Sequence, residues 1–447
     1  MTILRPIGKN TRIALFSKES SEGVYVPPTQ AMHFVSESFK YTPTVIEDPS
    51  NVGQVYTTDL IKSGYGVEGS VEAKLHPYFA GESFFFAIGK EDTPINPAQG
   101  FLVVWYKGSA NYARIRKVSS DVIAETSSDG STWAADSGFG TAGTLALASL
   151  TLSQIASAIN AYTDYKAVYL GYSAAPNSGL ADFANTILTY EGKSVGSLIK
   201  PFLATVGTTA KTHRIYPDNS ALTDIASFSG CVDRNFGESS KDIGLSGGKV
   251  TSLNIKFEPK NLVSITVGVK FKTQDNAVTF GAADVPTSKP FTTNNSKIFI
   301  DALGVDNPQE IKDLTIGINN NLFSDEAVGS ETFISQGRQG ATIEANGTLN
   351  LTVTDSTDEE TRALQDKMQN DLPVEVIAYM ENQEYADSAN YSKYAVLIRI
   401  RALKLSEAST VISGPDRLTL PIAGKGVYSP YGPHIEVWVI NRQLTAY

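Results

Sequence analysis

The chain carries one strand pattern twice. Residues 69–75 and 347–353 both begin with glycine and a small hydroxyl residue, after which apolar and polar side chains alternate. Two further alternating runs follow each of them in the same order, and these four runs are residues 250–255, 262–268, 400–405 and 418–424. A period of two is typical of strands that bury one face. The recurrence predicts two tandem copies of one β-domain and favours a protein that builds a symmetric assembly.

The two copies differ in length at one place. Residue 250 lies 181 positions after residue 69, and residue 400 lies 53 positions after residue 347, so the first copy has 181 − 53 = 128 additional residues. A structureless loop of that length is uncommon in a compact domain. We therefore predict an inserted domain. The predicted segments are 1–90 (first part of the first β-domain), 91–196 (insert), 197–300 (second part) and 301–447 (second β-domain).

Composition narrows the class of protein. A chain of 447 residues with 41% hydrophobic and 19% charged residues predicts a folded protein of two or three domains. The single cysteine, Cys231, excludes an internal disulfide and fits a reducing cytosol. The start has no secretory signal pattern, and the apolar runs are too short to span a bilayer. A net charge of −10 without a basic cluster argues against tight binding to nucleic acid. Solubility is the simpler explanation of this charge.

The insert is predicted to be a small α+β module. Its first expected strands are residues 101–106, 110–118 and 121–125. Thr151 and Gln154 have capping-box spacing, which predicts a helix from this point. Residues 181–190 fit either a short helix or a strand. Residues 198–206 have a helix-like pattern that Pro201 interrupts.

The β-domains are expected to contain mainly strands. Residues 1–90 fit mainly strands, and the proline and glycines within 45–66 predict an extended loop or a long hairpin. In the second copy, Ser356 and Glu359 have capping-box spacing, which predicts a helix over 357–369. The acidic residues at the start of this helix lie at the positive end of the helix dipole, which explains them without a bound metal ion.

Three short patterns match catalytic or cofactor motifs. Residues 138–143 fit the GxGxxG of dinucleotide-binding folds, with Asp164 at the distance of a ribose ligand, but loop-forming residues precede the glycines. Residues 192–196 fit the GxSxG of a hydrolase around Ser194, yet the alternating β and α units of such a hydrolase are missing. Residues 244–248 fit GxSxG before a strand. The four histidines form no close ligand pair. We therefore predict a non-enzymatic protein without a cofactor, metal site or catalytic residue.

The order of elements resembles the tail tube proteins of long-tailed bacteriophages. The segments that carry the resemblance are residues 69–75, 202–207, 212–217, 228–231, 250–255, 262–267, 314–321 and 340–353. The resemblance covers about 1–90 and 197–430, and the insert departs from the common pattern. It implies a mainly β fold, in which each domain is a β-sandwich with a flanking helix and its inner sheet joins its neighbours in a tube-forming β-barrel.

The resemblance also implies an assembly. Relatives with one such domain form hexameric rings, so a chain with two copies is expected to form a pseudo-hexameric ring as a homotrimer. Rings stack through long loops, for which 45–66 and 325–340 are the candidates. The tube carries DNA to the host through its lumen without tight binding. Other expected partners are the tape measure, tail terminator and distal tail proteins, and the expected location is the virion tail after assembly in the host cytoplasm.

Lumen-facing residues are expected among the polar positions of the two glycine-led strands. These candidates are Glu72, Lys74, Asn350 and Thr352. The insert is expected to decorate the outside of the ring, because a whole module inside a DNA-width channel would block it.

Three alternatives remain open. A distal tail or baseplate ring protein has the same fold, and the copy number per virion would separate it from a tube protein. A β-rich surface-binding protein would use the insert to bind glycans, although the chain lacks a signal peptide and a clear pattern of exposed aromatic residues. A hydrolase acting through Ser194 would lose activity on Ser194→Ala, and we expect no activity to lose.

Overall fold

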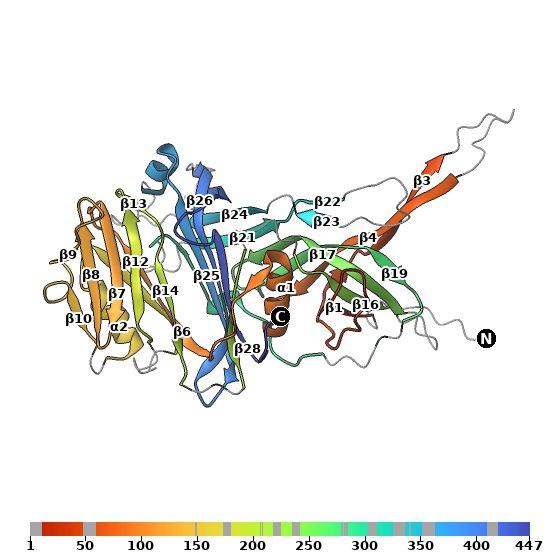
Figure 1. Cartoon of the computed structure of the whole chain (residues 1–447), viewed down its shortest axis with the longest axis horizontal. Coiled ribbons are helices and arrows are strands. Elements are labelled where there is room, and N and C mark those ends of the chain that lie inside the picture. Colours follow the sequence, from red (N-terminus) through yellow and green to blue (C-terminus); the bar gives the residue numbers. More distant parts are fainter. Residues whose placement is uncertain are drawn as a thin grey trace.

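The computed structural model describes most of the chain and shows a mainly β fold, as predicted (Figure 1). The described residues are 11–47, 60–147, 150–172, 180–205, 207, 209–217, 225–234, 242–278, 280, 285–302, 311–324, 336–338, 341–350, 363–408 and 419–447. In Figure 1 the insert lies on the left, the second copy in the middle and the first copy on the right.

The two copies share most of their succession of elements. The first copy contains β1 (Arg12–Lys18), β2 (Ser36–Glu37), β3 (Lys40–Glu47), β4 (Leu60–Lys74), α1 (Pro77–Ile88), β16 (Phe228–Asp233), β17 (Asp242–Phe257), β18 (Ser264–Phe271) and β19 (Thr273–Asp275). The second contains β20 (Ser296–Ile300), β21 (Ile311–Asn319), β22 (Leu322–Ser324), β23 (Gln336–Arg338), β24 (Thr342–Asn350), a helix over 363–369, β25 (Val374–Asp387), β26 (Ser392–Ala408), β27 (Thr419–Gly426) and β28 (Ile435–Asn441). The copies differ at β2 of the first copy and at the β22–β23 hairpin of the second.

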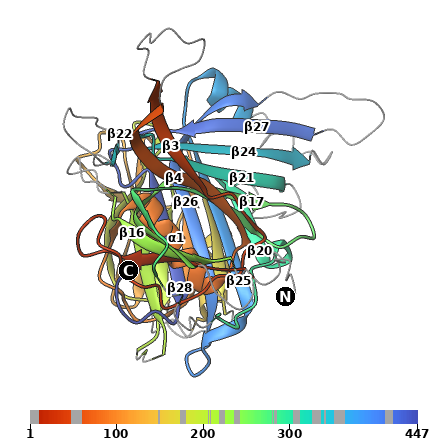
Figure 2. The same ribbon diagram turned by 90° about the vertical axis from the view of Figure 1, so that its right-hand side faces the viewer.

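The two copies share one continuous inner sheet. Its antiparallel order is β3–β4–β18–β17 in the first copy and β21–β24–β27–β26 in the second. The copies join where β17 pairs with β21, from Ser252 opposite Asn319 to Phe257 opposite Leu314. Figure 2 shows β4, β17, β21, β24 and β27 side by side in this layer.

A second layer covers the apolar side of the inner sheet in each copy. It consists of β1–β16–β17–β19 in the first copy and β20–β25–β26–β28 in the second. The long strands β17 and β26 therefore run through both layers. This pairing makes each copy a β-sandwich, which buries alternate side chains of both sheets.

The repeat extends to backbone irregularities. Register shifts occur at Val250/Ser252 in β17 and at Leu405/Glu407 in β26, and these positions differ by 405 − 250 = 155. The sequence pattern instead aligned residue 250 with residue 400, a difference of 150, so that alignment was wrong by five residues. An odd shift normally exchanges the two faces of a strand, but each of the compared stretches contains a bulge, one between Val250 and Ser252 and one between Ile400 and Leu403, and bulges are invisible in such a pattern.

The glycines that open the repeated pattern have similar local surroundings, although the shift of 155 between β18 and β27 places Gly347 at the position of Val71 and not of Gly69. A Cβ on Gly69 would lie 2.7 Å from the carbonyl oxygen of Ser38, and one on Gly347 would lie 2.5 Å from that of Asp313. Both glycines therefore allow the preceding strand to approach closely, and this requirement explains why the pattern begins with glycine in each copy.

The described part of 1–90 is mainly strands, as predicted, but helix α1 within it was not predicted. Pro77 stands at the first helical position, and Gly89 ends the helix with a left-handed φ of 115°. Nearly every side chain between them is buried, including Phe84, Phe85 and Phe86. A helix that is apolar all round has no helical stripe, so periodicity could not reveal it.

The close contact between Gly81 of α1 and Tyr447 gives a testable prediction. A Cβ on Gly81 would lie 1.7 Å from the hydroxyl oxygen of Tyr447, which accepts a hydrogen bond from Asn441. We expect Gly81→Ala to lower the free energy of unfolding by about 1–3 kcal/mol, because the ring must move. In a Tyr447→Ala background the same change should be neutral or stabilising, since alanine favours a helix by about 1 kcal/mol over glycine. Urea unfolding of the four proteins measures both effects, and equal losses in both backgrounds would contradict this explanation.

The described residues of the insert form two sheets and one helix. Its elements, with flanking strands, are β5 (Lys90–Glu91), β6 (Ala98–Tyr106), β7 (Tyr112–Val118), β8 (Asp121–Ser127), β9 (Ala134–Ala135), β10 (Thr144–Ala146), α2 (Leu152–Asn160), β11 (Tyr165–Gly171), β12 (Phe183–Tyr190), β13 (Lys193–Ser194), β14 (Leu198–Leu203) and β15 (Lys211–Tyr216). One sheet has the order β10–β8–β7–β12–β13, and the other has the order β11–β6–β14. The capping box of Thr151 and Gln154 is confirmed at the start of α2.

Two local predictions are resolved here. Residues 183–190 form a strand, which settles the open choice for 181–190. The helix-like pattern over 198–206 was wrong, because residues 198–203 form β14 at the edge of a sheet. An edge strand tolerates Pro201, which has no amide hydrogen to donate. The sheet of the insert thus runs to Leu203, whereas the four-segment division of the chain stays a prediction. In the second copy, 363–369 is helical, and the earlier part of the predicted helix lies outside the described residues.

Candidate assembly surfaces and the buried junction behind them

The inner sheet has one apolar and one polar face. Val71 and Ala73 of β4 are fully buried against the outer layer, and the intervening Glu72 and Lys74 lie on the opposite, partly exposed face. Thr266 of β18 lies opposite Glu72 and shares that face. Two of the four predicted lumen residues therefore lie together on the polar face.

The other two predicted lumen residues belong to β24 and the segment after it. The backbone of Asn350 pairs with Thr419 at the end of β24. The side chain of Asn350 and the whole of Thr352 lie outside the described residues. Among their described neighbours, Glu344 and Asn346 alternate with the buried Ile343 and Ala345, as Glu72 alternates with Val71.

Both signs of charge occur on the polar face. By strand alternation and register, its described lysines are Lys40, Lys74, Lys256, Lys270, Lys404 and Lys425, and its described carboxylates are Glu68, Glu72, Asp313, Glu344 and Glu407. Lys425 lies 3.4 Å from Glu344, and Lys404 forms an ion pair with Asp371. The face is therefore mixed, with a slight excess of lysine, although the chain as a whole is acidic.

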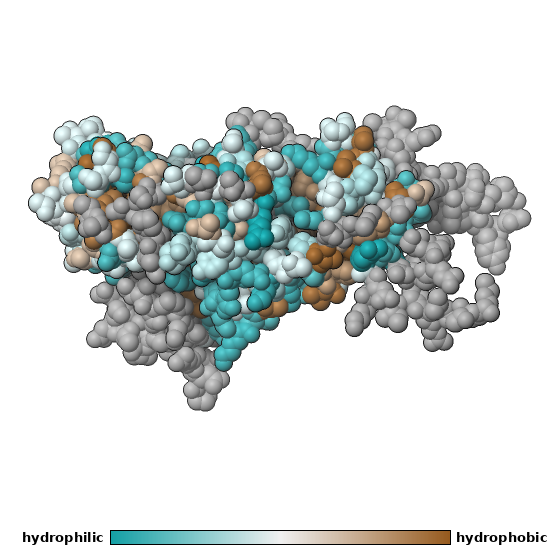
Figure 3. Space-filling view, turned by 90° about the horizontal axis from the view of Figure 1, so that it is seen from below, coloured by the Kyte–Doolittle hydropathy of each residue, from teal (hydrophilic) through white to brown (hydrophobic). Residues whose placement is uncertain are grey.

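The inner sheet ends in two strand edges. Among the described residues, β3 pairs only with β4, and residues 404–408 of β26 pair only with β27. Such edges present unpaired backbone groups that favour pairing with another chain. On the face seen in Figure 3, hydrophobic residues of the described part form only small, separate groups. The strand edges, and not a large apolar patch on that face, are therefore the described features that favour association with another chain.

A long hairpin extends from the first copy. Strands β3 and β4 pair from Lys40 opposite Glu68 to Glu47 opposite Leu60, and they project beyond the body of the molecule (Figure 1). This confirms the hairpin interpretation of 45–66, while the tip, 48–59, lies outside the described residues. In the second copy, β22 and β23 form a shorter hairpin, and most of the 325–340 candidate also lies outside them.

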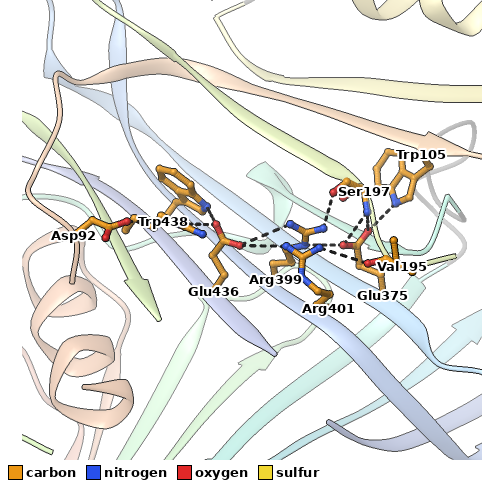
Figure 4. Close-up of polar contacts among 10 residues, drawn as sticks. Asp92, Trp105, Val195, Ser197, Glu375, Arg399, Arg401, Glu436 and Trp438 are labelled. Atoms are coloured by element: carbon orange, nitrogen blue, oxygen red, sulfur yellow. Dashed lines mark hydrogen bonds and ion pairs between the residues drawn. The ribbon is translucent and has the colours of Figure 1, made fainter. Parts of the chain in front are cut away.

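A buried charge network joins the insert to the outer layer of the second copy (Figure 4). Glu375 of β25 accepts hydrogen bonds from the Trp105 indole at 3.0 Å and from the Ser197 amide at 3.0 Å. It also accepts one from Arg399 Nε at 2.6 Å, and Arg399 donates to the Ser197 carbonyl at 2.6 Å. Glu375 and Arg399 are only 2% and 3% exposed. One carboxylate therefore binds a strand of the second copy and two segments of the insert.

The network continues around Glu436 of β28. Arg214 Nε and the Trp438 indole donate to Glu436 at 2.8 Å each. Burial opposes ionisation of Glu436, but the guanidinium groups of Arg214 and Arg399 outweigh it and lower its pKa. Burial is the main cause that lowers the pKa of Arg401 to about 10, and the positive charge of the nearby Arg399 acts in the same direction. The network thus keeps its charges ionised by pairing them.

Aromatic contacts flank this network. Tyr172 stacks on Tyr391 with ring centroids 4.6 Å apart, and Tyr190 contacts Tyr431 at 5.5 Å. Between them, Phe101 of β6 packs against aromatic rings of β25 and β28. The insert is therefore held at several points across the outer layer of the second copy, although it is inserted into the sequence of the first.

None of the motif matches forms the expected site. Residues 138–143 lie between β9 and β10, and α2 begins only at Leu152, so no helix opens on the glycines. Ser194 lies in the β12–β13 hairpin and is followed by strand β14, not by the helix of a nucleophile elbow. Ser246 lies inside β17. The ring of His213 is buried, with hydrogen bonds at both nitrogens.

Within the described part of the chain, no cluster of histidine, cysteine and acidic residues could hold a metal ion. No helix there is both long and apolar enough to cross a membrane.

The described residues thus form tandem sandwiches with a shared inner sheet, a polar face and two strand edges that are available for pairing. The family model described as phage tail tube protein matches residues 8–426, and the chain belongs to this family. It is thus a structural component of a bacteriophage tail, as the resemblance indicated. No curated protein matches the chain.

Sequence reasoning missed the buried network. Its carboxylates and guanidinium groups lie inside strands that are otherwise apolar, at Glu375, Arg399 and Glu436. A charge within an apolar strand is a signal for a buried pair, because an unpaired charge there is costly. Nothing in the pattern indicates which residues pair.

Proposed function

We propose that three copies of the chain form a ring and that stacked rings form the tail tube. The observation that carries this proposal is the β17–β21 pairing, which joins two sandwiches edge to edge within one chain. If β26 of one chain pairs with β3 of the next in the same manner, three chains of eight inner strands close a barrel of 3 × 8 = 24 strands. Closure removes the open edges.

In this ring the polar face of the inner sheet lines the lumen. The apolar face is already covered by the outer layer, so the polar face with Glu72 and Lys74 is the one left for water and DNA. DNA is bound tightly where many cationic groups neutralise phosphates together. Lysines interspersed with carboxylates would support sliding and not tight binding, which suits a passage to the host.

The insert lies on the outside of this ring. It packs on the outer layer of the second copy, which separates it from the inner sheet (Figure 1). Because it occurs once per chain, three lobes are expected per ring. The β3–β4 hairpin is the candidate for contact with the adjacent ring.

Electron microscopy of the purified protein tests the ring. We expect hollow rings or tubes in negative stain, with three outer lobes per ring and a ring mass of 3 × 48.0 = 144 kDa by mass photometry. A monomer under all conditions of salt and concentration would contradict the proposal. Rings with the lobe inside the channel would contradict the placement of the insert.

A further inference from the structure

The first copy has an apolar groove at its open end. The groove has a volume of about 110 Å³ and lies between strand β3 of the inner sheet and the outer layer. Its apolar lining residues are Phe39, Tyr41, Val67, Val232, Ile243 and Leu245. Tyr41 is 41% exposed, and Ile243 is partly exposed. Exposed apolar walls at a strand edge indicate a surface that another element covers.

The second copy shows the same groove in its covered state. By strand register and the shift of 155, its equivalent residues are Ile316, Ile318, Ile343, Ala378, Ile398 and Ile400. All six are no more than 2% exposed. The position of Tyr41 is thus taken by the buried Ile318, and that of Ile243 by the fully buried Ile398.

Helix α1 of the first copy is the element that crosses this end of the second copy. It contacts both β26 and β28. At its start, Asn441 of β28 donates to the Pro77 carbonyl at 3.4 Å, and the hydroxyl of Tyr78 lies 3.4 Å from that of Tyr394. At its end, Asn320 donates to the Ala87 carbonyl at 3.0 Å. The helix therefore spans the open end from one side to the other.

The second copy has a helix at the equivalent position, residues 363–369 after β24. Leu364 is buried in its own copy, and Lys367 forms an ion pair with Asp301 at 2.6 Å. Asp366 and Gln369 remain exposed. We propose that the helix over 363–369 of one chain covers the groove of the first copy in the next chain. This inference rests on the proposed ring. It adds a second contact between neighbouring chains, in addition to the pairing of β26 with β3.

A charge in the groove tests the contact. We expect Ile243→Glu to raise the protein concentration needed for ring assembly by at least about tenfold, because docking would bury a carboxylate in a groove whose lining cation, Arg234, already pairs with Glu37 at 3.1 Å. Val118→Glu is the matched control, since Val118 is 45% exposed on the insert. It should assemble as the wild type does. Circular dichroism and thermal melting check that both monomers are folded.

Crosslinking keeps the test decisive if Ile243→Glu fails to fold. In assembled rings of a Tyr41→Cys, Gln369→Cys variant, a short bismaleimide should link chains into dimers and trimers on a denaturing gel. A Val118→Cys, Gln369→Cys variant should give none. If the wild type assembles but Ile243→Glu assembles equally well, or the Tyr41–Gln369 pair does not crosslink, the groove contact is wrong while the ring stands. If the wild type never assembles, both proposals fail.

Discussion

Replacing Glu375 by alanine should lower the free energy of unfolding by about 3–5 kcal/mol, the usual cost of leaving a buried charge without its partner. The substitution removes the acceptor of the Trp105 indole and of the Ser197 amide. It leaves Arg399, 3% exposed, with the Ser197 carbonyl and a more distant carboxylate 3.7 Å away on Glu436. Urea unfolding followed by tryptophan fluorescence suits this measurement, because Trp105 and Trp438 lie in the network.

A surface ion pair provides the control for this prediction. Lys425 and Glu344 lie 3.4 Å apart on the polar face, with side chains 70% and 45% exposed. Glu344→Ala should change stability by less than about 1 kcal/mol. Glu375→Gln keeps the shape and one acceptor but loses the charge, so it should fall between the two. A loss for Glu375→Ala no larger than that for Glu344→Ala would show that the network does not stabilise the junction.

The strands were largely predictable because apolar and polar residues alternate in the sequence wherever a sheet buries one face. The glycine-led strand at Gly69, its partner β18 and the repeat at Gly347 are examples, and their pairing order is the same in both copies. The alternation also placed Glu72 and Lys74 on the polar face correctly. Helix α1 was not predicted, because burial on all sides removes the periodic contrast between apolar and polar residues on which such predictions depend.

The tertiary contacts could not be read from the sequence. Trp105 and Glu375 are 270 residues apart, and no local pattern links them. The position of the insert depends on such contacts. The sequence places it inside the first copy, whereas its sheet packs on the second. Spacing along the chain predicts where a module is inserted but carries no information about which neighbour it covers.

Deleting the insert should therefore abolish folding of the second copy and not only remove a surface decoration. The ends of the module are adjacent, since Ala204 donates to the Pro97 carbonyl at 2.9 Å and Asn96 to the Thr205 carbonyl at 3.2 Å. A short Gly-Ser linker can thus replace 97–204. The deletion would expose Trp438 and the charge network around Glu375. We expect the loss to exceed about 5 kcal/mol, the lower end of the total stability of natural proteins.

Solubility, thermal melting and hydrogen exchange of the deletion variant measure this effect. Exchange protection should be lost in β25, β26 and β28, and the protein should aggregate or melt below the wild type. A control variant that keeps the module between two copies of the same linker should behave as the wild type, which separates the loss of packing from the presence of a linker. If the deletion variant is stable and forms smooth rings, the insert is a dispensable decoration. The predicted result would instead show that the insert covers the second sandwich, because without it two buried carboxylates and two guanidinium groups would face water beside an uncovered apolar sheet.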